Sequence, residues 1–510
     1  MRSDDKRLVL QSALFFASVT LTACGGGSHT PTQAPPPVTI PTITTTGSDF
    51  YLTLPDHLCV SDPSSCNNLP VTNKLIVAAA AATTGEVTFD GVIMPFSVAA
   101  GAEAVITLDP AVVLTANEKV ETKGIHVTSQ SPVSVHVVSE NATSADGYLA
   151  LPTPGLGTRY YVMSYASTRY SGSEFAVVAT QNNTTVSITP SAAGATNPAG
   201  IMFTVSLNAG ETYQLANPAN ADMTGTLVTA DKPIAVFSGH RCADAPSGVG
   251  YCDYLVEQLP DVSIWGRTFH TSPFSGRARY TVRVIASQNG TTFTTLPAGL
   301  ITGTLNAGQF ADVVITGAGE FVASNPALVA QFMRGYDDDT SAKGDPSMVL
   351  VTPAEMGITD ATFGVHGLAG TTGAYMNVIT ETAALATLKL DNVAVDTWLF
   401  TPLGGTSIYS AGTIPVTAGA HSMMGTVPFS ALAYDYGISW NAVSYAYPVA
   451  ARLSLPGAGP AVNPSSTGCG NDQHDDDRYL ADADDHAGQS RFGTQPHEGR
   501  HENDDSHECD

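Results

Sequence analysis

The 510-residue chain is poor in charged residues, and most of those it has are acidic. Asp, Glu, Lys and Arg make up 13% of it, and 46 acidic residues against 21 basic ones give a net charge of −25. Scarce charge argues against long solvated helices, and abundant Thr, Val, Ala and Gly favour strands joined by short turns. Because phosphates would be repelled by the acidic excess, nucleic acid is not an expected partner.

Motifs that carry well-known chemistries are also missing. The sequence has no GxSxG elbow, no HExxH, no P-loop and no GxGxxG between a strand and a helix. It also has no CxxC pair, which argues against a structural zinc site. We therefore predict a protein that is not an enzyme. Carboxylate pairs for glycan hydrolysis stay open as an alternative, because they are assembled in space and leave no local motif.

The first residues have the layout of an exported lipoprotein. Basic residues precede an uncharged, largely apolar run at 8–21, which is too short for a membrane span. The run ends in Leu-Thr-Ala-Cys24, which resembles the lipobox of bacterial lipoproteins and implies cleavage after residue 23 and acylation of Cys24. Gly25 is not the Asp associated with inner-membrane retention, so the resemblance implies an outer-membrane lipoprotein, surface-exposed on the bacterial envelope. The Gly-, Pro- and Thr-rich residues 24–48 read as a stalk, and no later apolar run reaches 18 residues.

The cysteine count fits an oxidising compartment. Seven cysteines leave six once Cys24 is acylated, and four of these form close pairs, Cys59 with Cys66 and Cys242 with Cys252. We expect both pairs to be disulfides. A loop of this size contributes about 3 kcal/mol to stability. Pairing of Cys469 with Cys509 is left open.

Three short patterns recur along the chain, which indicates internal repetition. The first joins an apolar run to a Thr-rich run through Gln-Asn-Asn or Gln-Asn-Gly, at 175–186 and 282–293, and is a hairpin signal. The second is an Ala-Gly turn in which Gly is expected to adopt a positive φ, at Gly101, Gly210, Gly308 and Gly419. The third is a strand opened by proline, expected at a sheet edge or at the first position of a strand, at Pro132, Pro233 and Pro326.

The repeat length indicates the fold class. The turn glycines are 109, 98 and 111 residues apart, about the size of one β-sandwich domain. We predict an all-β ectodomain over 49–455 made of four tandem sandwich-like units, at about 50–155, 156–260, 261–353 and 354–455. A propeller-like body is the alternative, although about 100 residues per blade exceed the usual 40–50.

Variable polar segments follow the proline strands and are candidate binding loops. Because they occupy one place in the repeat, they should project from equivalent ends of their units. The candidate binding residues are His240, Arg241, Arg334, Tyr336, Asp337, Asp338 and Asp339. The three aspartates together with Asp345 could also gather oxygen ligands for Ca²⁺, although the EF-hand spacing is missing. A plain solvated connection is an equally good interpretation of these loops.

The last residues differ in composition. Residues 471–510 hold 13 acidic residues against 3 arginines, which predicts a disordered acidic tail over 456–510. Imidazoles in the tail could weakly capture a transition metal, the alternative being a tail that only solvates the protein. The candidate ligands are His474, His486, His497, His501 and His507.

A family resemblance lies in the strands around the third pattern. It is clearest in Thr-Ala-Asp-Lys-Pro-Ile-Ala-Val-Phe-Ser-Gly-His at 229–240, Gln-Leu-Pro at 258–260, Trp-Gly-Arg at 265–267 and Ser-Tyr-Ala-Tyr-Pro at 444–448. Over roughly residues 120–450 the chain resembles the N-terminal domain family of IgGFc-binding protein. The resemblance implies a secreted adhesive or binding domain and supplies no catalytic residue.

Together these features favour a non-enzymatic surface lipoprotein whose ectodomain binds an extracellular glycoprotein or polysaccharide. Two other classes stay open, an extracellular glycan hydrolase and a structural envelope protein without a specific ligand.

Overall fold

Strands dominate the structure. The computed structural model describes residues 42–338, 343–369, 371, 373–437 and 443–454. Within this part, the only α-helix is α1 (Leu58–Ser61), and no helix is long and apolar enough to cross a membrane. Short 3-10 helices lie in the connections, at η1 (Pro63–Cys66), η2 (Pro110–Val112), η3 (Thr153–Gly155), η4 (Val262–Ile264), η5 (Tyr336–Asp338), η6 (Ala354–Met356), η7 (Thr382–Thr387) and η8 (Thr397–Leu399). The all-β prediction is confirmed.

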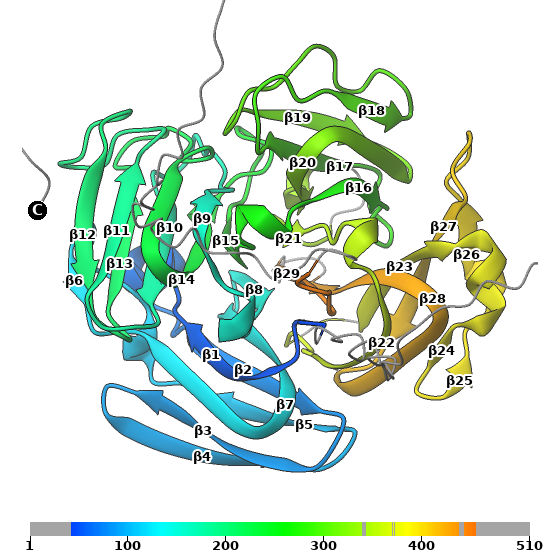
Figure 1. Ribbon diagram of the computed structural model, residues 1–510, viewed down its shortest axis with the longest axis horizontal. Coiled ribbons are helices and arrows are strands. Elements are labelled where there is room, and N and C mark those ends of the chain that lie inside the picture. Colours follow the sequence, from blue (N-terminus) through cyan, green and yellow to red (C-terminus); the bar gives the residue numbers. More distant parts are fainter. Residues whose placement is uncertain (1–41, 339–342, 370, 372, 438–442, 455–510) are drawn as a thin grey trace, which may run out of the picture. The chain divides into compact units, whose positions relative to one another are not determined.

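Four antiparallel sheets follow one another along the chain (Figure 1). The first contains β1 (Gly47–Leu52), β2 (Thr72–Ala79), β3 (Thr83–Phe89), β4 (Val92–Val98), β5 (Ala102–Thr107), β7 (Ile125–Glu140) and β8 (Ala145–Leu149). The second contains β6 (Val120–Glu121), β9 (Gly157–Tyr161), β10 (Ser173–Ala179), β11 (Thr184–Thr189), β12 (Phe203–Leu207), β13 (Thr212–Ala216), β14 (Leu227–Ala243) and β15 (Asp253–Gln258). The third contains β16 (Gly266–Thr271), β17 (Tyr280–Ala286), β18 (Phe293–Leu296), β19 (Phe310–Ile315), β20 (Gly319–Met333) and β21 (Ser347–Leu350). The fourth contains β22 (Ile358–Val365), β23 (Ala374–Glu381), β24 (Lys389–Leu390), β25 (Val393–Ala394), β26 (Phe400–Pro402), β27 (Tyr409–Val416), β28 (Gly419–Tyr436) and β29 (Ser444–Pro448).

Each sheet is built on one long strand, β7, β14, β20 or β28, and the first three of these carry the proline of the third pattern. The prediction that this proline opens a strand or lies at an edge is wrong, because it lies inside the strand. In β14, residues 227–230 pair with β9 and β11, and residues 234–240 pair with β10. Pro233 falls in the gap between these ladders, where no amide donor is needed. In the fourth long strand, β28, Pro428 likewise lies between two ladders, and the sequence patterns did not predict this proline.

The first pattern also behaves differently from the prediction. Its Gln-Asn centres are turns, but β10 and β11 do not pair with each other as a hairpin. They pair with different halves of β14, and β17 and β18 likewise pair with different halves of β20. The turn therefore carries the chain between two parts of a curled, sandwich-like sheet. The Ala-Gly turns match the prediction, with φ of +68° at Gly101 and +79° at Gly210.

The four sheets share their hydrophobic cores in a ring. One cluster joins the first and second sheets through Val127 and Phe237, and a second joins the second and third through Phe175 and Phe332. A third cluster joins the third and fourth sheets, and a fourth returns from the fourth sheet to Val138 of the first. Because every core is built from two sheets, each sheet depends on its neighbours for burial.

The last strand of each sheet lies at the centre of this ring (Figure 1). β8 contacts β15 and β29, and β21 contacts the same two strands, so these four inner strands surround a common axis. The buried carboxylate of Asp146 on β8 links them, accepting hydrogen bonds from the amides of Val256 (3.2 Å), Met348 (3.2 Å) and Ala446 (3.4 Å). One side chain therefore joins strands of all four sheets.

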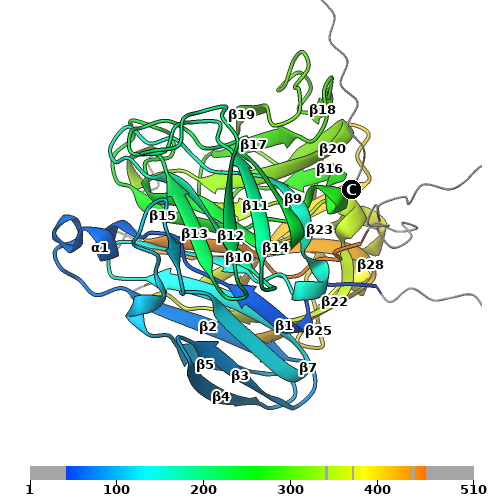
Figure 2. The ribbon, with the colours of Figure 1, turned by 60° about the vertical axis from the view of Figure 1, so that its left-hand side comes forward.

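The axis has two different ends. The loops that connect each long strand to its inner strand gather where the inner strands begin, which we call the loop end; α1 marks it on the left of Figure 2. Where the inner strands finish, Thr45 N donates to Ala451 O (2.9 Å) and Leu453 N donates to Ile43 O (2.8 Å). We call this the closure end, because the first and last described segments are hydrogen-bonded there.

Candidate binding surface

Three segments contact one another at the loop end and form what we call the loop surface, residues 166–172, 244–252 and 334–338. The amide of Gly335 donates to Ala245 O (2.6 Å), and the Tyr251 and Tyr336 rings meet edge to face with their centroids 5.4 Å apart. Ser247 Oγ donates to Ala166 O (3.0 Å). The loops that follow the long strands β14 and β20 therefore lie side by side at this end, together with the segment between β9 and β10.

The middle segment is held by a disulfide and a carboxylate. The expected disulfide between Cys242 and Cys252 is formed, as is that between Cys59 and Cys66. Asp244 accepts hydrogen bonds from Ser167 Oγ, from Thr168 N (3.0 Å) and Oγ1 (2.9 Å), and from Gly248 N (2.6 Å). Burial alone would raise the pKa of Asp244, but these donors lower it below its ordinary value. The ionised carboxylate thus fastens two of the three segments together.

The third segment is fixed by an arginine fork. Arg334 is 6% exposed and donates to both carboxylate oxygens of Asp338, at 2.6 and 2.8 Å, and to Thr281 Oγ1 at 2.7 Å. Arg279 also donates to Asp338 Oδ2 (2.9 Å). Burial would raise the pKa of Asp338, but the two guanidinium groups hold it low. Arg334 and Asp338, both predicted as binding residues, therefore shape the loop and are not free to take a ligand.

Two other predicted residues are placed differently from the expectation. His240 is fully buried in β14, where its Nδ1 accepts from Cys242 N (2.9 Å), and burial lowers its pKa to about 3. It is thus a neutral interior residue and does not contribute to the surface. Arg241 is half-buried and donates through Nε to Ser171 O (2.6 Å), with Asp56 3.8 Å away.

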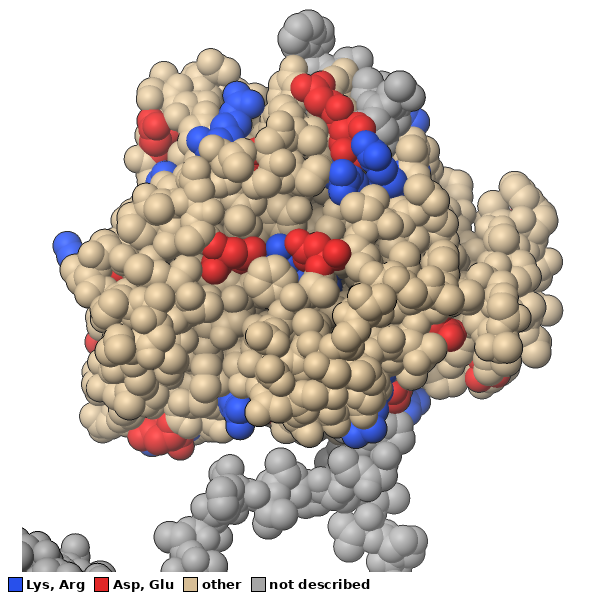
Figure 3. Space-filling view, turned by 90° about the horizontal axis from the view of Figure 1, so that it is seen from above, with Lys and Arg blue, Asp and Glu red and all other residues tan. Residues whose placement is uncertain are grey.

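The groups left accessible are aromatic, basic and acidic. Tyr251 is 44% exposed, Arg169 is exposed with its guanidinium 5.9 Å from the Tyr170 ring centroid, and Asp337 is exposed beside Tyr336. The sequence patterns identified Tyr336 and Asp337 and missed Arg169, Tyr170 and Tyr251. Arg169 and Tyr170 lie before the apolar run of the first pattern and not in a segment that follows a proline strand. Charged residues are sparse on this molecule, and the face in Figure 3 carries a few red and blue groups, some of them side by side, on a largely uncharged surface.

Of the predicted metal ligands, only some lie in the part of the chain that the structure describes. Within the described ranges, no three His, Cys, Asp or Glu side chains come together as metal ligands. Asp345 is 3% exposed and packs at the axis, where burial raises its pKa well above the ordinary value. Several predicted residues lie outside the described part of the chain: Cys24, Asp339, His474, His486, His497, His501 and His507.

Buried carboxyls along the axis, between the loop surface and the closure end, were not anticipated from the sequence. Asp253 accepts from Ala145 N (2.7 Å) and Ser444 N (3.3 Å), and Glu257 accepts from Leu350 N (2.9 Å). Both carboxyls are fully buried, which raises their pKa well above ordinary values. These side chains link segments of different sheets, Asp253 next to the loop surface and Glu257 nearer the closure end.

Fold and surface together define a class: a ring of four curled β-sheets that presents a disulfide-closed loop surface at one end of its axis. The family model described as "IgGFc binding protein" matches residues 146–434, and the chain belongs to that family. Human IgGFc-binding protein is 27% identical to it over 295 residues, which are 56% of this chain and 5% of the human protein. The chain therefore spans a small part of that relative's length. A solved structure described as a Ca²⁺-stabilized adhesin that helps an Antarctic bacterium reach out and bind ice overlaps 80% of this chain and 98% of its own. It has 11% identity to this chain and a TM-score of 0.11.

Proposed function

We propose that this chain is a bacterial surface lipoprotein whose loop surface binds an extracellular glycoprotein or polysaccharide without catalysing a reaction. The observation that carries the proposal is the position of the loop surface. It lies where the inner strands begin, and the hydrogen-bonded segments 43–45 and 451–453 lie where they finish. The six residues of β15 alone separate the two ends by about 20 Å. A membrane anchor at Cys24 would then leave the loop surface facing outward.

The chemistry of the surface suits recognition. Tyrosine and arginine are enriched where binding energy concentrates, because they combine large contact areas with hydrogen-bonding groups. Tyr251 and Tyr336 are held by a disulfide-closed loop and an arginine fork, so little conformational freedom would be lost on binding. Aromatic faces also suit the apolar faces of sugars, which supports a glycosylated ligand.

The cavities support binding over glycan hydrolysis. Cavities of about 560, 390 and 70 Å³ are each lined by one carboxylate, from Asp360, Glu140 and Glu257 respectively. Glycosidases use two carboxyl groups about 5–10 Å apart across the scissile bond. The paired carboxyls of Asp253 and Asp345 are buried at the axis, where no substrate would reach them.

The ligand can be sought on an array of glycans and glycoproteins, including immunoglobulin Fc because of the relative's name, probed with residues 25–510. We expect a saturable signal that is lost in a Tyr251→Ser/Tyr336→Ser double variant and retained in Arg267→Ser, an exposed residue of the closure end. Equal binding by both variants, or no signal on any glycan or glycoprotein, would contradict the proposal.

The anchor needs its own test. Mass spectrometry of the cell-derived protein should find a diacylated N-terminal Cys24, and Cys24→Ala should leave the protein in the soluble periplasmic or secreted fraction. An unmodified Cys24 in a membrane-free fraction would contradict the lipoprotein assignment and leave the binding test unaffected.

A further inference from the structure

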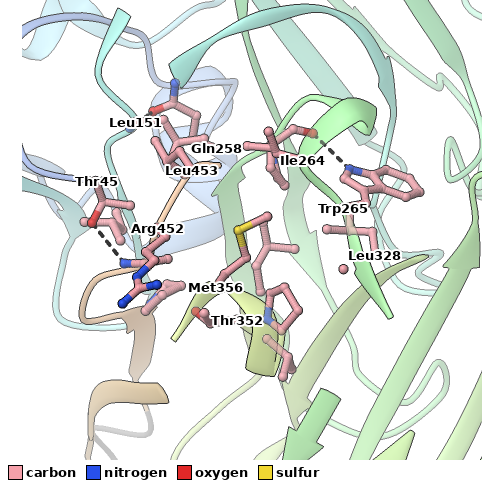
Figure 4. Close-up of a pocket in the computed structure, with 18 of the residues that line it drawn as sticks. Thr45, Leu151, Gln258, Ile264, Trp265, Leu328, Thr352, Met356, Arg452 and Leu453 are labelled. Atoms are coloured by element: carbon pink, nitrogen blue, oxygen red, sulfur yellow. Dashed lines mark hydrogen bonds between the residues drawn. The ribbon is translucent and has the colours of Figure 1, made fainter. Parts of the chain in front are cut away.

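An apolar pocket lies on the axis at the closure end, away from the loop surface (Figure 4). Its volume is about 70 Å³. The last residues of all four inner strands line it, namely Leu149, Gln258, Leu350 and Pro448. The pocket is thus a product of the ring and would not exist in an isolated sheet.

The walls of the pocket are mostly apolar. Ile264, Trp265, Leu328 and Met356 surround it in Figure 4, and Trp265 and Met356 are each 2% exposed. The indole nitrogen of Trp265 already donates to Pro260 O (3.1 Å), so the ring presents apolar surface to the pocket. Such walls favour an aliphatic group over a polar one.

Two polar side chains at the pocket have hydrogen-bond donors that no group in the described part of the protein accepts from. Arg452 lines it, and among the described residues no Asp or Glu lies within ion-pair distance of its guanidinium. Gln258 is 2% exposed; its Oε1 accepts from Leu151 N (2.8 Å), and its Nε2 is a buried donor without an acceptor. An arginine in the lining of an apolar pocket, without an ion-pair partner within the described ranges, matches a ligand that combines a carboxylate with a hydrocarbon chain.

The size of the pocket limits that hydrocarbon chain. A cavity of about 150 Å³ accepts benzene, so a volume of about 70 Å³ suits roughly three or four carbon atoms. Long acyl chains exceed it.

We propose that this pocket binds a free short-chain aliphatic carboxylate, with its alkyl chain against Leu149, Trp265 and Met356 and its carboxylate paired with Arg452. This site is separate from the loop surface and does not depend on the function proposed for that surface.

The one acidic group in the pocket wall does not oppose an anion. Glu257 accepts a hydrogen bond from Leu350 N (2.9 Å), and its carboxyl is 1% exposed. Burial raises its pKa well above the ordinary value, because the charged form of the carboxyl is disfavoured there.

The test is calorimetric titration of residues 25–510 with butyrate, n-butylamine and octanoate. Butyrate should bind and change the fluorescence of Trp265, butylamine should not bind because its charge is reversed, and octanoate should bind more weakly because its chain exceeds the pocket. Arg452→Gln should lower the affinity for butyrate about tenfold or more, because a charge-assisted pair is lost. The matched variant Arg267→Gln, at the same end but outside the pocket lining, should bind as the parent does.

Absence of heat at about 10 mM butyrate would overturn the proposal, since such binding would be too weak to be specific. Equal binding of butyrate and butylamine, or unchanged butyrate affinity in Arg452→Gln, would also overturn it. If Arg452→Gln failed to fold, the comparison of the three probes on the parent protein would still decide.

Discussion

Replacing Arg283 by methionine should destabilise the protein by about 3 kcal/mol. Arg283 lies on β17 of the third sheet, and its side chain is 3% exposed. Its guanidinium donates to both oxygens of Asp312 (2.7 Å each), and through Nη1 to Asp222 (2.7 Å) and Ser164 O (2.6 Å), which lie in connections between strands of the second sheet. The interaction therefore joins two sheets of the ring.

The magnitude follows from the burial of the partners. Removing one partner of a fully buried ion pair costs about 3–5 kcal/mol, because the other charge stays unpaired. The side chains of Asp222 and Asp312 are 15% and 37% exposed, so water can partly resolvate them and the cost falls to the lower part of that range. The cation–π contacts to Phe310 (4.3 Å) and Tyr165 (4.7 Å) are also lost, but methionine sulfur partly replaces them.

Urea unfolding followed by tryptophan fluorescence gives the difference, with Arg267→Met as the control. This exposed residue should change the free energy of unfolding by no more than about 0.5 kcal/mol. A loss below about 1 kcal/mol for Arg283→Met, in a protein that still folds, would refute the argument that this arginine joins the sheets.

Three further predictions follow from the same structure. Because neighbouring sheets share their cores, urea unfolding should be one transition by fluorescence and by circular dichroism; two separated transitions would contradict the shared cores. Glu174→Met should stabilise the protein by about 2 kcal/mol at pH 7, because both oxygens of this fully buried carboxyl lack partners. Burial raises the pKa of Glu174 in the folded protein, so the parent protein loses stability as pH rises above the pKa of the unfolded state, about 4.3. The stability advantage of Glu174→Met should therefore grow from pH 4 to pH 7. A difference in stability that does not change with pH would count against this prediction. Replacing Cys242 and Cys252 together by serine should cost about 3 kcal/mol in thermal unfolding for a bridge spanning 10 residues, and a cost near zero would show that the loop is ordered without it.

Much of the fold could be predicted from the sequence because its repeat is local. The turn glycines, the proline strands and the spacing of about 100 residues gave the all-β class, and both local disulfides followed from close cysteine pairs. Strand partners were harder, because pairing depends on contacts remote in sequence. The Gln-Asn turns looked like hairpins, yet the strands beside them pair with different halves of one long strand.

The candidate site was only partly predictable, for a physical reason. Sequence patterns treat a polar residue in a loop as solvated, and they cannot tell whether a partner removes it from water. His240, Arg334 and Asp338 are polar loop candidates by type, but the fold buries the first and pairs the other two. Tyr251 sits inside the disulfide loop, and only its contact with Tyr336 across two sheets marks it as part of a surface.

A hydrogen-exchange footprint of residues 25–510, with and without the ligand found on the array, shows directly where that ligand binds. We predict slower exchange on binding in 166–172, 244–252 and 334–338, and no change at the closure end around 43–45 and 451–453. Protection confined to the closure end or to the outer strands of the ring would contradict the assignment of the loop surface as the binding site.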